Sequence, residues 1–421
     1  MKNNYYDENN KISSDILFDK INIIKQRCDT LNVLRINRAL VTMKPNFQYV
    51  YSIVPTLLHC NHHLLPGYLD STVPHGICLF TLEKHHKIFL YKILNTDSEF
   101  VNTNSEKPIT SVYSMGSTSS IGQNNNSDID IWVFYQSWLN NEERTKLHIK
   151  CALIKEWAAT NKGVNLHLFI LEENSFIENK DINSDSYLVI NNIFVLEEFY
   201  RTAVHMSGKK IIWNIVPIEE EPNYDKYILS LYKNGIFSHQ EWFDLGKIGT
   251  ISINNYLYAS RYQLHKSIYY PYKSVLKMLL LEAYSWEYPN PKLLAMHIKR
   301  LLHNNKKILY YFDPYCMLLD RITYYLYQIN DLTRLDLVRR CFYLKVSEQL
   351  STSLSSSSIN WRRKIMMNLV KNWGWNFERV RMLDNYINVN RKNIEINEEL
   401  LDAMIHSYHK LMFLIKKKQC T

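Results

Sequence analysis

The sequence predicts an α+β protein in which a small mixed sheet lies between a helical N-terminal region and a mostly α-helical C-terminal region. Residues 14–44 carry apolar side chains at helical spacing. Residues 110–171 alternate between short β-rich runs and one long helical pattern. Beyond residue 220, helical patterns follow one another to the end of the chain. We therefore expect three regions, over residues 1–107, 108–218 and 219–421.

Two helices are expected before the sheet. The first covers residues 14–44 and ends at Pro45, because proline cannot continue a helix. The second covers residues 47–59. The polar segment 95–108 is typical of a loop and separates this region from the next one.

The central region is expected to hold a small mixed sheet with helices on one face. The strands are predicted near residues 110–115, 129–135 and 164–171, with a weaker candidate at 188–195. Helices are predicted over residues 142–160 and 196–207, ending at Gly163 and Gly208. The C-terminal helices are predicted around residues 225–235, 254–270, 272–286, 292–303, 314–328, 332–350, 360–372, 375–386 and 396–417.

Composition limits the function classes. The 421 residues carry a net charge of +9, which favours anionic ligands, but no stripe of basic and aromatic residues indicates nucleic-acid binding. The apolar runs are too short to span a membrane, and the polar N-terminus is not that of a secretory signal. Seven cysteines without a Cys-x-x-Cys pair fit a reducing compartment, so we expect a cytoplasmic protein.

The segment VYSMGSTSSIGQNNNSDIDIWVF, residues 112–134, carries the strongest functional signal. Side chains on a strand alternate between faces, so Asp128 and Asp130 are expected on the same face, about 7 Å apart. Two such carboxylates can hold Mg²⁺, which shares oxygen ligands with substrate phosphates. Gly116 allows a phosphate to approach the backbone, and the following loop offers N–H groups and hydroxyls. A surface turn followed by an ordinary strand is the simpler alternative.

Gly-Ser followed by a short loop and Asp-x-Asp on a strand resembles the pattern of the nucleotidyltransferase superfamily. Longer strings resemble the class I adenylate cyclases of enteric bacteria over nearly the whole chain; they include QYVYSIVPTLLH, LLLEAYSWEYPNPKLLA, DPYCMLLDRI and TRLDLVRRCFYLK. The resemblance implies a nucleotidyltransferase-like core that converts ATP to cyclic AMP and pyrophosphate. It also implies a Mg²⁺ cofactor, with Mn²⁺ as an alternative.

The resemblance assigns roles to residues of the central motif. Asp128 and Asp130 are expected to be catalytic and to hold the metal, and Gly116 and Ser117 to cradle the triphosphate. Two further residues, Ser127 and Trp132, are expected to contact the nucleotide. For Trp132, an anchor between the sheet and a helix is the alternative. A third carboxylate is expected on the strand GVNLHLFILEEN, where Asn165 and His167 stand at the start and Glu172 at the end. Glu172 is the candidate metal ligand, and Asn165 could ligate through its carbonyl oxygen.

Phosphate-binding cations are expected outside the motif. The resemblance favours Lys209, with a solvated lysine pair as the alternative, and Lys266. Lys273 and Lys277, four residues apart on the following helix, share a helix face and are further candidates. The chain departs from the family signature at three positions: Tyr258 stands where the family tends to have glycine, Tyr262 replaces a tryptophan and His265 a tyrosine.

The resemblance also bears on length and partners. Chains of the family continue for hundreds of residues with a regulatory half, so this chain is expected to be truncated and to lack that half and its phosphotransferase-system partner. The expected ligand is ATP, with no nucleic acid and no membrane span. Two alternatives are a nucleotidyltransferase that uses a separate acceptor, and a catalytically weak nucleotide-binding remnant.

Overall fold

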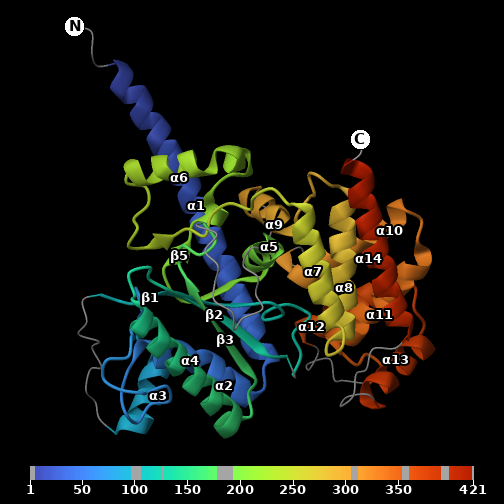
Figure 1. Cartoon of the computed structure of the whole chain (residues 1–421), viewed down its shortest axis with the longest axis horizontal. Helices are drawn as coiled ribbons and strands as arrows, with labels where there is room; N and C mark the ends of the chain where they lie inside the picture. The colour runs from blue at the N-terminus through green and yellow to red at the C-terminus, as the bar shows by residue number, and fades with distance from the viewer. Residues whose placement is uncertain are drawn as a thin grey trace.

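The computed structural model describes residues 5–95, 106–125, 127–177, 193–304, 312–352, 360–389 and 398–419. Within these ranges the chain combines helices with a small mixed sheet, as the predicted α+β class requires. Figure 1 shows the sheet and its neighbouring helices in one half of the molecule and a bundle of the later helices in the other. The region boundaries at residues 107 and 218 stay predictions, because one apolar core joins side chains from Ile21 to Ala295.

Helices precede the sheet. They are α1 (Tyr5–Thr42), α2 (Pro45–His59) and α3 (Lys84–Leu94). Pro45 occupies the first turn of α2, where its missing N–H removes no helical hydrogen bond. The residue that ends the first helical pattern therefore starts the next helix. The predicted helices over residues 14–44 and 47–59 are confirmed, whereas α3 had no predicted counterpart.

The sheet has four strands in the order β3-β2-β1-β4. They are β1 (Ile109–Met115), β2 (Ile129–Tyr135), β3 (Leu166–Glu172) and β4 (Val204–Gly208). β1 pairs antiparallel with both β2 and β4, whereas β2 and β3 are parallel. The mixed sheet and its first three strands are confirmed. The central position of β1 and β2 places the motif loop between them at one end of the sheet.

A long crossover helix, α4 (Asn141–Lys162), connects the parallel strands β2 and β3. Asn140 caps it, since its side chain accepts from the Glu143 N–H at 3.0 Å and the Glu143 carboxylate accepts from the Asn140 N–H at 2.9 Å. Gly163 ends it with a φ of +61°, the left-handed conformation common after helices. These local signals explain why the sequence predicted this helix and the following strand.

The segment after β3 differs from the prediction. α5 covers Ile193–Thr202, so the predicted helix over residues 196–207 is wrong beyond Thr202, where β4 begins. The weaker strand prediction is wrong at residues 193–195, and its other residues, 188–192, lie outside the described ranges. The physical reason is pairing with β1: Val204 pairs with Ser114, and this edge position overrides a helical pattern.

Both faces of the sheet are covered, so the expectation of helices on one face is wrong. Successive residues of β2 point to opposite faces. Ile129, Ile131 and Val133 join an apolar core with α2, α3 and α4. Trp132 and Phe134 join a second core with α1 and α5. Because Asp130 has the same parity as Trp132, its side chain projects on the α5 side.

The rest of the chain is mainly helical, as predicted. After the short parallel pair β5 (Lys210–Ile211) and β6 (Trp242–Phe243), the first of the later helices packs in the core that holds β2 and α5, and the others pack around a core of their own. These elements are α6 (Tyr224–Lys233), α7 (Ile253–Lys266), α8 (Pro271–Trp286), α9 (Leu294–His303), α10 (Pro314–Gln328), α11 (Leu332–Val346), α12 (Trp361–Asn372), α13 (Phe377–Val389) and α14 (Glu398–Gln419). No helix in the described ranges combines the length and the apolar character that a membrane span requires.

Glu282 of α8 links the helices of the bundle. Its carboxylate is fully buried and accepts from two guanidinium nitrogens of Arg334 on α11, at 2.7 and 3.0 Å. It also accepts from the Tyr325 hydroxyl of α10 at 2.6 Å. Lys410 of α14 lies 3.8 Å away. Since breaking a buried ion pair costs stability, this residue is expected to be important for the free energy of unfolding.

We expect Glu282→Ala to lower the free energy of unfolding by about 3 kcal/mol, because the buried Arg334 would lose one of its two carboxylates and keep only Asp331, to which its Nε donates at 2.7 Å. Urea denaturation followed by circular dichroism measures this change. The control is Glu142→Ala, which removes an exposed carboxylate paired with Lys146 and should leave the midpoint unchanged. A midpoint of the Glu282 variant equal to that of the control would contradict the assignment.

Candidate active site

The glycine bend lies at the end of β1. Gly116 has a φ of +80°, a backbone conformation that other residues adopt only with strain. Its N–H donates to Thr202 Oγ1 at 3.0 Å. Met115 pairs with Asp130 across β1 and β2, and a Cβ on Gly116 would lie 3.4 Å from Asp130 Oδ2. The structure therefore brings Gly116 and Asp130 directly together.

Each of the two aspartates has polar partners from other elements. Asp130 Oδ1 lies 3.2 Å from His167 Nδ1, in keeping with the pairing of these residues across β2 and β3. Asp128 Oδ1 accepts from Asn165 Nδ2 at 2.6 Å, and its Oδ2 accepts from the Tyr270 hydroxyl at 3.0 Å. The positions where a third carboxylate was expected are thus occupied by one amide and one imidazole, each in contact with an aspartate.

The environment keeps Asp130 ionised. Burial acts to raise the pKa of its carboxyl group, but the His167 hydrogen bond and the positive charges of Lys273 and Lys277 outweigh it and lower this pKa. For Tyr270, burial and the nearby Asp128 raise the pKa to about 12, so its hydroxyl remains a donor. An ionised carboxylate is the form that ligates a metal.

Basic residues of α8 face the aspartates. Lys277 donates to both carboxylate oxygens of Glu198 on α5, at 2.7 Å each. Burial acts to raise the pKa of Glu198, but Lys277 and Arg201 lower it to about 2. Lys273 lies one helical turn before Lys277, and within the described residues it has no hydrogen-bond or ion-pair partner. Burial acts to lower the pKa of Lys273, but the electrostatic influence of Tyr315, Asp130 and Glu198 outweighs it and raises this pKa. Its ammonium group therefore stays charged beside Asp130.

The helical bundle holds the loop between β1 and β2. The Ile121 N–H donates to Asp313 Oδ2 at 2.8 Å, and the Ile121 carbonyl accepts from Arg362 Nε at 3.2 Å. The Gly122 carbonyl accepts from Lys345 Nζ at 2.7 Å. These contacts come from the start of α10, from α11 and from α12. Burial and the charges of Lys273 and Arg362 lower the pKa of Lys345 to about 7.

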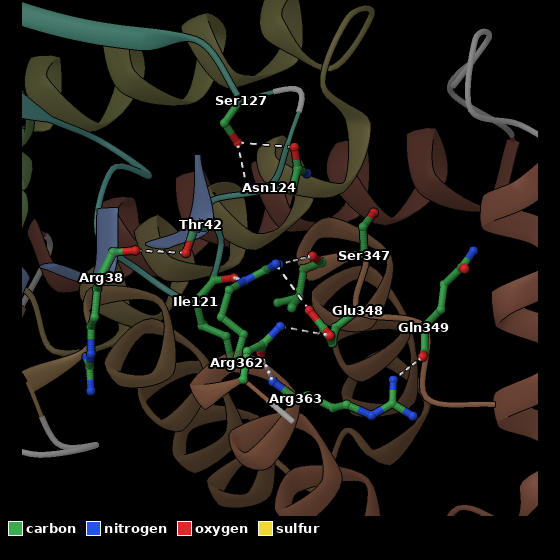
Figure 2. Close-up of polar contacts among 12 residues, drawn as sticks. Arg38, Thr42, Ile121, Asn124, Ser127, Ser347, Glu348, Gln349, Arg362 and Arg363 are labelled. Carbon is green, nitrogen blue, oxygen red and sulfur yellow. Dashed lines mark hydrogen bonds and ion pairs between the residues drawn. The ribbon is translucent and has the colours of Figure 1, made fainter. Parts of the chain in front are cut away.

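Figure 2 shows Arg362 between the Ile121 carbonyl and the carboxylate of Glu348, to which its Nη1 donates at 3.2 Å. Beside this contact lies a polar cavity of about 560 Å³. Residues of α1, of the motif loop, of the α11–α12 connection and of α12 line it, among them Thr42, Asn124, Glu348, Gln349 and Arg363. Arg362 therefore lies between this cavity and the back of the motif loop.

The loop itself is more enclosed than predicted. The N–H groups of Ser119 and Ser120 are bonded to Gln123 Oε1 at 2.7 Å and to the Ser117 carbonyl at 3.1 Å. Ser117 is largely buried, and the Ser119 hydroxyl is buried without a partner in the described chain. In the same part of the chain, the backbone N–H groups of Ser117 and Thr118 make no hydrogen bond. In the described part of the loop, these two backbone N–H groups and the Ser119 hydroxyl remain as donors for a phosphate at the bend.

Two predicted residues lie far from the bend. The Lys209 N–H donates to the Thr110 carbonyl at 3.0 Å, which places Lys209 at the start of β1, about 20 Å from Gly116 along the strand. Glu172 ends β3 and pairs with Tyr135. It lies about 17 Å along β3 from His167, the residue that pairs with Asp130. Glu172 is buried and lies 3.5 Å from Arg144. Neither the predicted triphosphate contact nor the predicted third metal ligand fits these positions.

Trp132 lies on the Asp130 face of β2 but is only 1% exposed. Its ring stacks on Phe199 of α5, with centroids 4.5 Å apart, and on Phe176 at 5.7 Å. A nucleotide cannot reach the indole in this arrangement. The position corrects the expected nucleotide contact and supports the alternative, an anchor between the sheet and a helix.

The remaining predicted residues lie around the aspartates. Lys266 ends α7, and its ammonium group lies 5.7 Å from the ring centroids of both Tyr262 and Tyr270. Since the Tyr270 hydroxyl contacts Asp128, Lys266 lies at the edge of the site. The Ser127 hydroxyl accepts from the Asn124 N–H at 3.0 Å, so it stabilises the turn before Asp128.

A divalent cation fits the two aspartates. In the described part of the chain, no three His, Cys, Asp or Glu side chains gather as a ready metal cluster. Mg²⁺, however, usually binds through one or two carboxylates together with waters and substrate phosphates. Asp128 and Asp130, with the ionised state that the basic residues impose on Asp130, meet that requirement.

Sequence reasoning missed several residues of the site. Nothing in the local pattern marks Glu198, Tyr270 or Lys345, because their roles depend on which helices pack against the motif loop. The four-residue spacing of Lys273 and Lys277 was a usable signal, since it predicts a shared helix face. Asp313 carries a different signal, as an acidic cap before a proline that starts α10.

Comparisons with known proteins extend the resemblance. Residues 20–214 match the model of the adenylate cyclase NT domain, and residues 251–421 match that of the second domain of class I adenylate cyclase. The adenylate cyclase of Yersinia intermedia is 52% identical over 397 residues, and that of Escherichia coli (strain K12) is 50% identical over 400 residues. Each match covers 93% of this chain and 46% of the relative, so the chain spans about half the length of these relatives. No solved structure matches the chain.

Proposed function

The chain belongs to the class I adenylate cyclase family, and we propose that it converts ATP to 3′,5′-cyclic AMP and pyrophosphate. In this reaction the ribose 3′-oxygen bonds to the α-phosphorus while the bond to pyrophosphate breaks. The observation that carries the proposal is the placement of Asp130 beside the Gly116 bend and near the charged Lys273. This arrangement joins a cation-binding carboxylate to an anion-binding ammonium group, as transfer at a phosphate requires.

Asp128 and Asp130 are the residues that would hold Mg²⁺ or Mn²⁺. When bound, the metal would lower the pKa of the 3′-hydroxyl and neutralise charge on the pyrophosphate. His167 and Asn165 would fix the carboxylate orientations, because each contacts one aspartate. We further propose that the sheet is nucleotidyltransferase-like, since a glycine bend and an Asp-x-Asp pair occupy neighbouring antiparallel strands.

Lys273 is the proposed triphosphate contact in place of Lys209. Its ammonium group is charged, lies on the Asp130 side and has no partner in the described chain that competes with a phosphate. Lys277 has a different role, because Glu198 engages it in a two-oxygen ion pair. That pair would hold the α8 side chains in place while Lys273 binds the substrate. A substrate such as ATP also supports the predicted cytoplasmic location.

Incubation of the purified chain with ATP and Mg²⁺, and in parallel with Mn²⁺, tests the proposal. Chromatography should detect cyclic AMP and pyrophosphate in equal amounts, and EDTA should abolish both. Formation of a nucleotidylated product only when a separate acceptor is added would instead support another nucleotidyltransferase. Bound ATP with no product under any condition would support the non-catalytic alternative.

A further inference from the structure

Two partly exposed tyrosines of the helical bundle lie near the aspartate pair. Tyr262 on α7 is 38% exposed and Tyr270, in the turn before α8, is 43% exposed. Large aromatic rings usually bury most of their surface, and grouped exposed rings often mark a binding surface. These two rings belong to the helical bundle, whereas the aspartates belong to the sheet, so the rings and the carboxylates meet where the two halves of the molecule join.

One ring contacts the proposed site directly, and Lys266 connects it to the other. The Tyr270 hydroxyl donates to Asp128 Oδ2 at 3.0 Å. The Lys266 ammonium group lies over both rings, 5.7 Å from each centroid. Tyr262 also lies within the electrostatic influence of Lys273 and Asp130. A nucleotide whose phosphates approach Lys273 and the aspartates would therefore bring its base within reach of these rings.

We propose that Tyr262 and Tyr270 form the platform on which the purine ring of ATP stacks. The proposal rests on the proposed function and specifies which of the chain's tyrosines bind the base. The purine would take the place that the Lys266 ammonium group occupies over these rings. Lys266 would move to the edge of the purine, whose ring nitrogens accept hydrogen bonds. The platform also fills the role expected for Trp132, which is enclosed between Phe199 and Phe176.

Other exposed tyrosines lack the contacts that carry this inference. Tyr258 and Tyr269 are exposed on the same segment, but no contact links either of them to the aspartates within the described chain. Tyr324, on α10, is 51% exposed and has the same chemistry without a place at the site. It therefore serves as a matched control for removal of an exposed tyrosine ring.

The test compares two ligands that share phosphates but differ in the base. Dissociation constants for α,β-methylene-ATP, which cannot be cyclised, and for tripolyphosphate are measured by isothermal titration calorimetry with Mg²⁺. Tyr262→Leu should weaken binding of the ATP analogue by about tenfold, because one base–aromatic stack is lost. Its affinity for tripolyphosphate should stay within about twofold of the wild type. Tyr324→Leu should change neither affinity.

A second variant separates the ring of Tyr270 from its hydroxyl. Tyr270→Phe keeps the ring and should retain the preference for the ATP analogue over tripolyphosphate, whereas Tyr270→Leu should lose most of it. Equal weakening of both ligands by Tyr262→Leu would overturn the platform, as would a wild-type chain that binds tripolyphosphate as tightly as the analogue. In that last case the phosphate site would still stand. Base-dependent binding without cyclic AMP formation would leave the platform intact and overturn the proposed reaction.

Discussion

Asp130→Asn is expected to lower kcat for cyclic AMP formation by at least about a hundredfold while the fold is retained. The substitution keeps the size of the side chain and a hydrogen-bonding oxygen near His167, but it removes the charge that would bind the metal. The basic residues nearby lower the pKa of Asp130 because they favour its ionised form. The neutral amide loses the attraction to these positive groups and to the metal, so metal affinity should fall together with the rate.

Initial rates over a range of ATP concentrations, together with Mn²⁺ titration by electron paramagnetic resonance, separate the two effects. A matched control is Asp225→Asn, since this aspartate is exposed and its nearest ion-pair partner, Lys247, lies 3.6 Å away on the surface. Circular dichroism should be the same for both variants and the wild type. An Asp130 variant with a near-normal rate would remove the metal assignment.

Lys273→Met is expected to cause the second-largest loss, about a hundredfold in kcat/KM. The methionine preserves the apolar stem but deletes an ammonium group whose charge is held near Asp130 and Glu198. Without it, negative charge on the triphosphate would be left uncompensated on the α8 side. We expect inhibition by pyrophosphate to weaken in parallel, because that product would occupy the same position.

Kinetics with ATP and inhibition constants for pyrophosphate measure this effect. Lys364→Met, on the exposed side of α12, is the matched control and should leave both values unchanged. A Lys273 variant whose pyrophosphate inhibition constant equals that of the wild type would show that this lysine does not contact the phosphates. Loss of rate alone would then indicate that Lys273 acts through Asp130.

Local patterns predicted most helices and the first three strands because those elements depend on signals inside each segment. The apolar run from Ile131 to Phe134 identified β2, and the glycine stop at Gly163 marked the end of α4. β4 was not predicted, because it forms by pairing with β1, which is far from it in the sequence. The second covered face of the sheet was missed for a similar reason: the sequence shows which residues share a face but not which helices return to cover it.

The candidate site divides in the same way. The proximity of Gly116 and Asp130 could be predicted because both follow from one motif and one antiparallel pairing. Lys209 and Glu172 were placed at the site although each lies at the other end of its strand pair, because strand identity does not specify which end of the sheet a residue occupies. Lys345 lies far from the motif in sequence, so only the packed bundle could reveal it.

The contacts that hold the motif loop have a consequence for when this chain reaches its final structure during synthesis on the ribosome. The two aspartates are synthesised early. The side chains that bind the backbone of Ile121 and Gly122 are synthesised much later; they belong to Asp313, Lys345 and Arg362. A nascent chain in which the sheet is complete would still lack the contacts that hold the loop between β1 and β2. The ability to bind substrate would therefore arise late in translation. A fragment that contains the helical bundle, added separately, should restore this ability to an N-terminal fragment that contains the sheet.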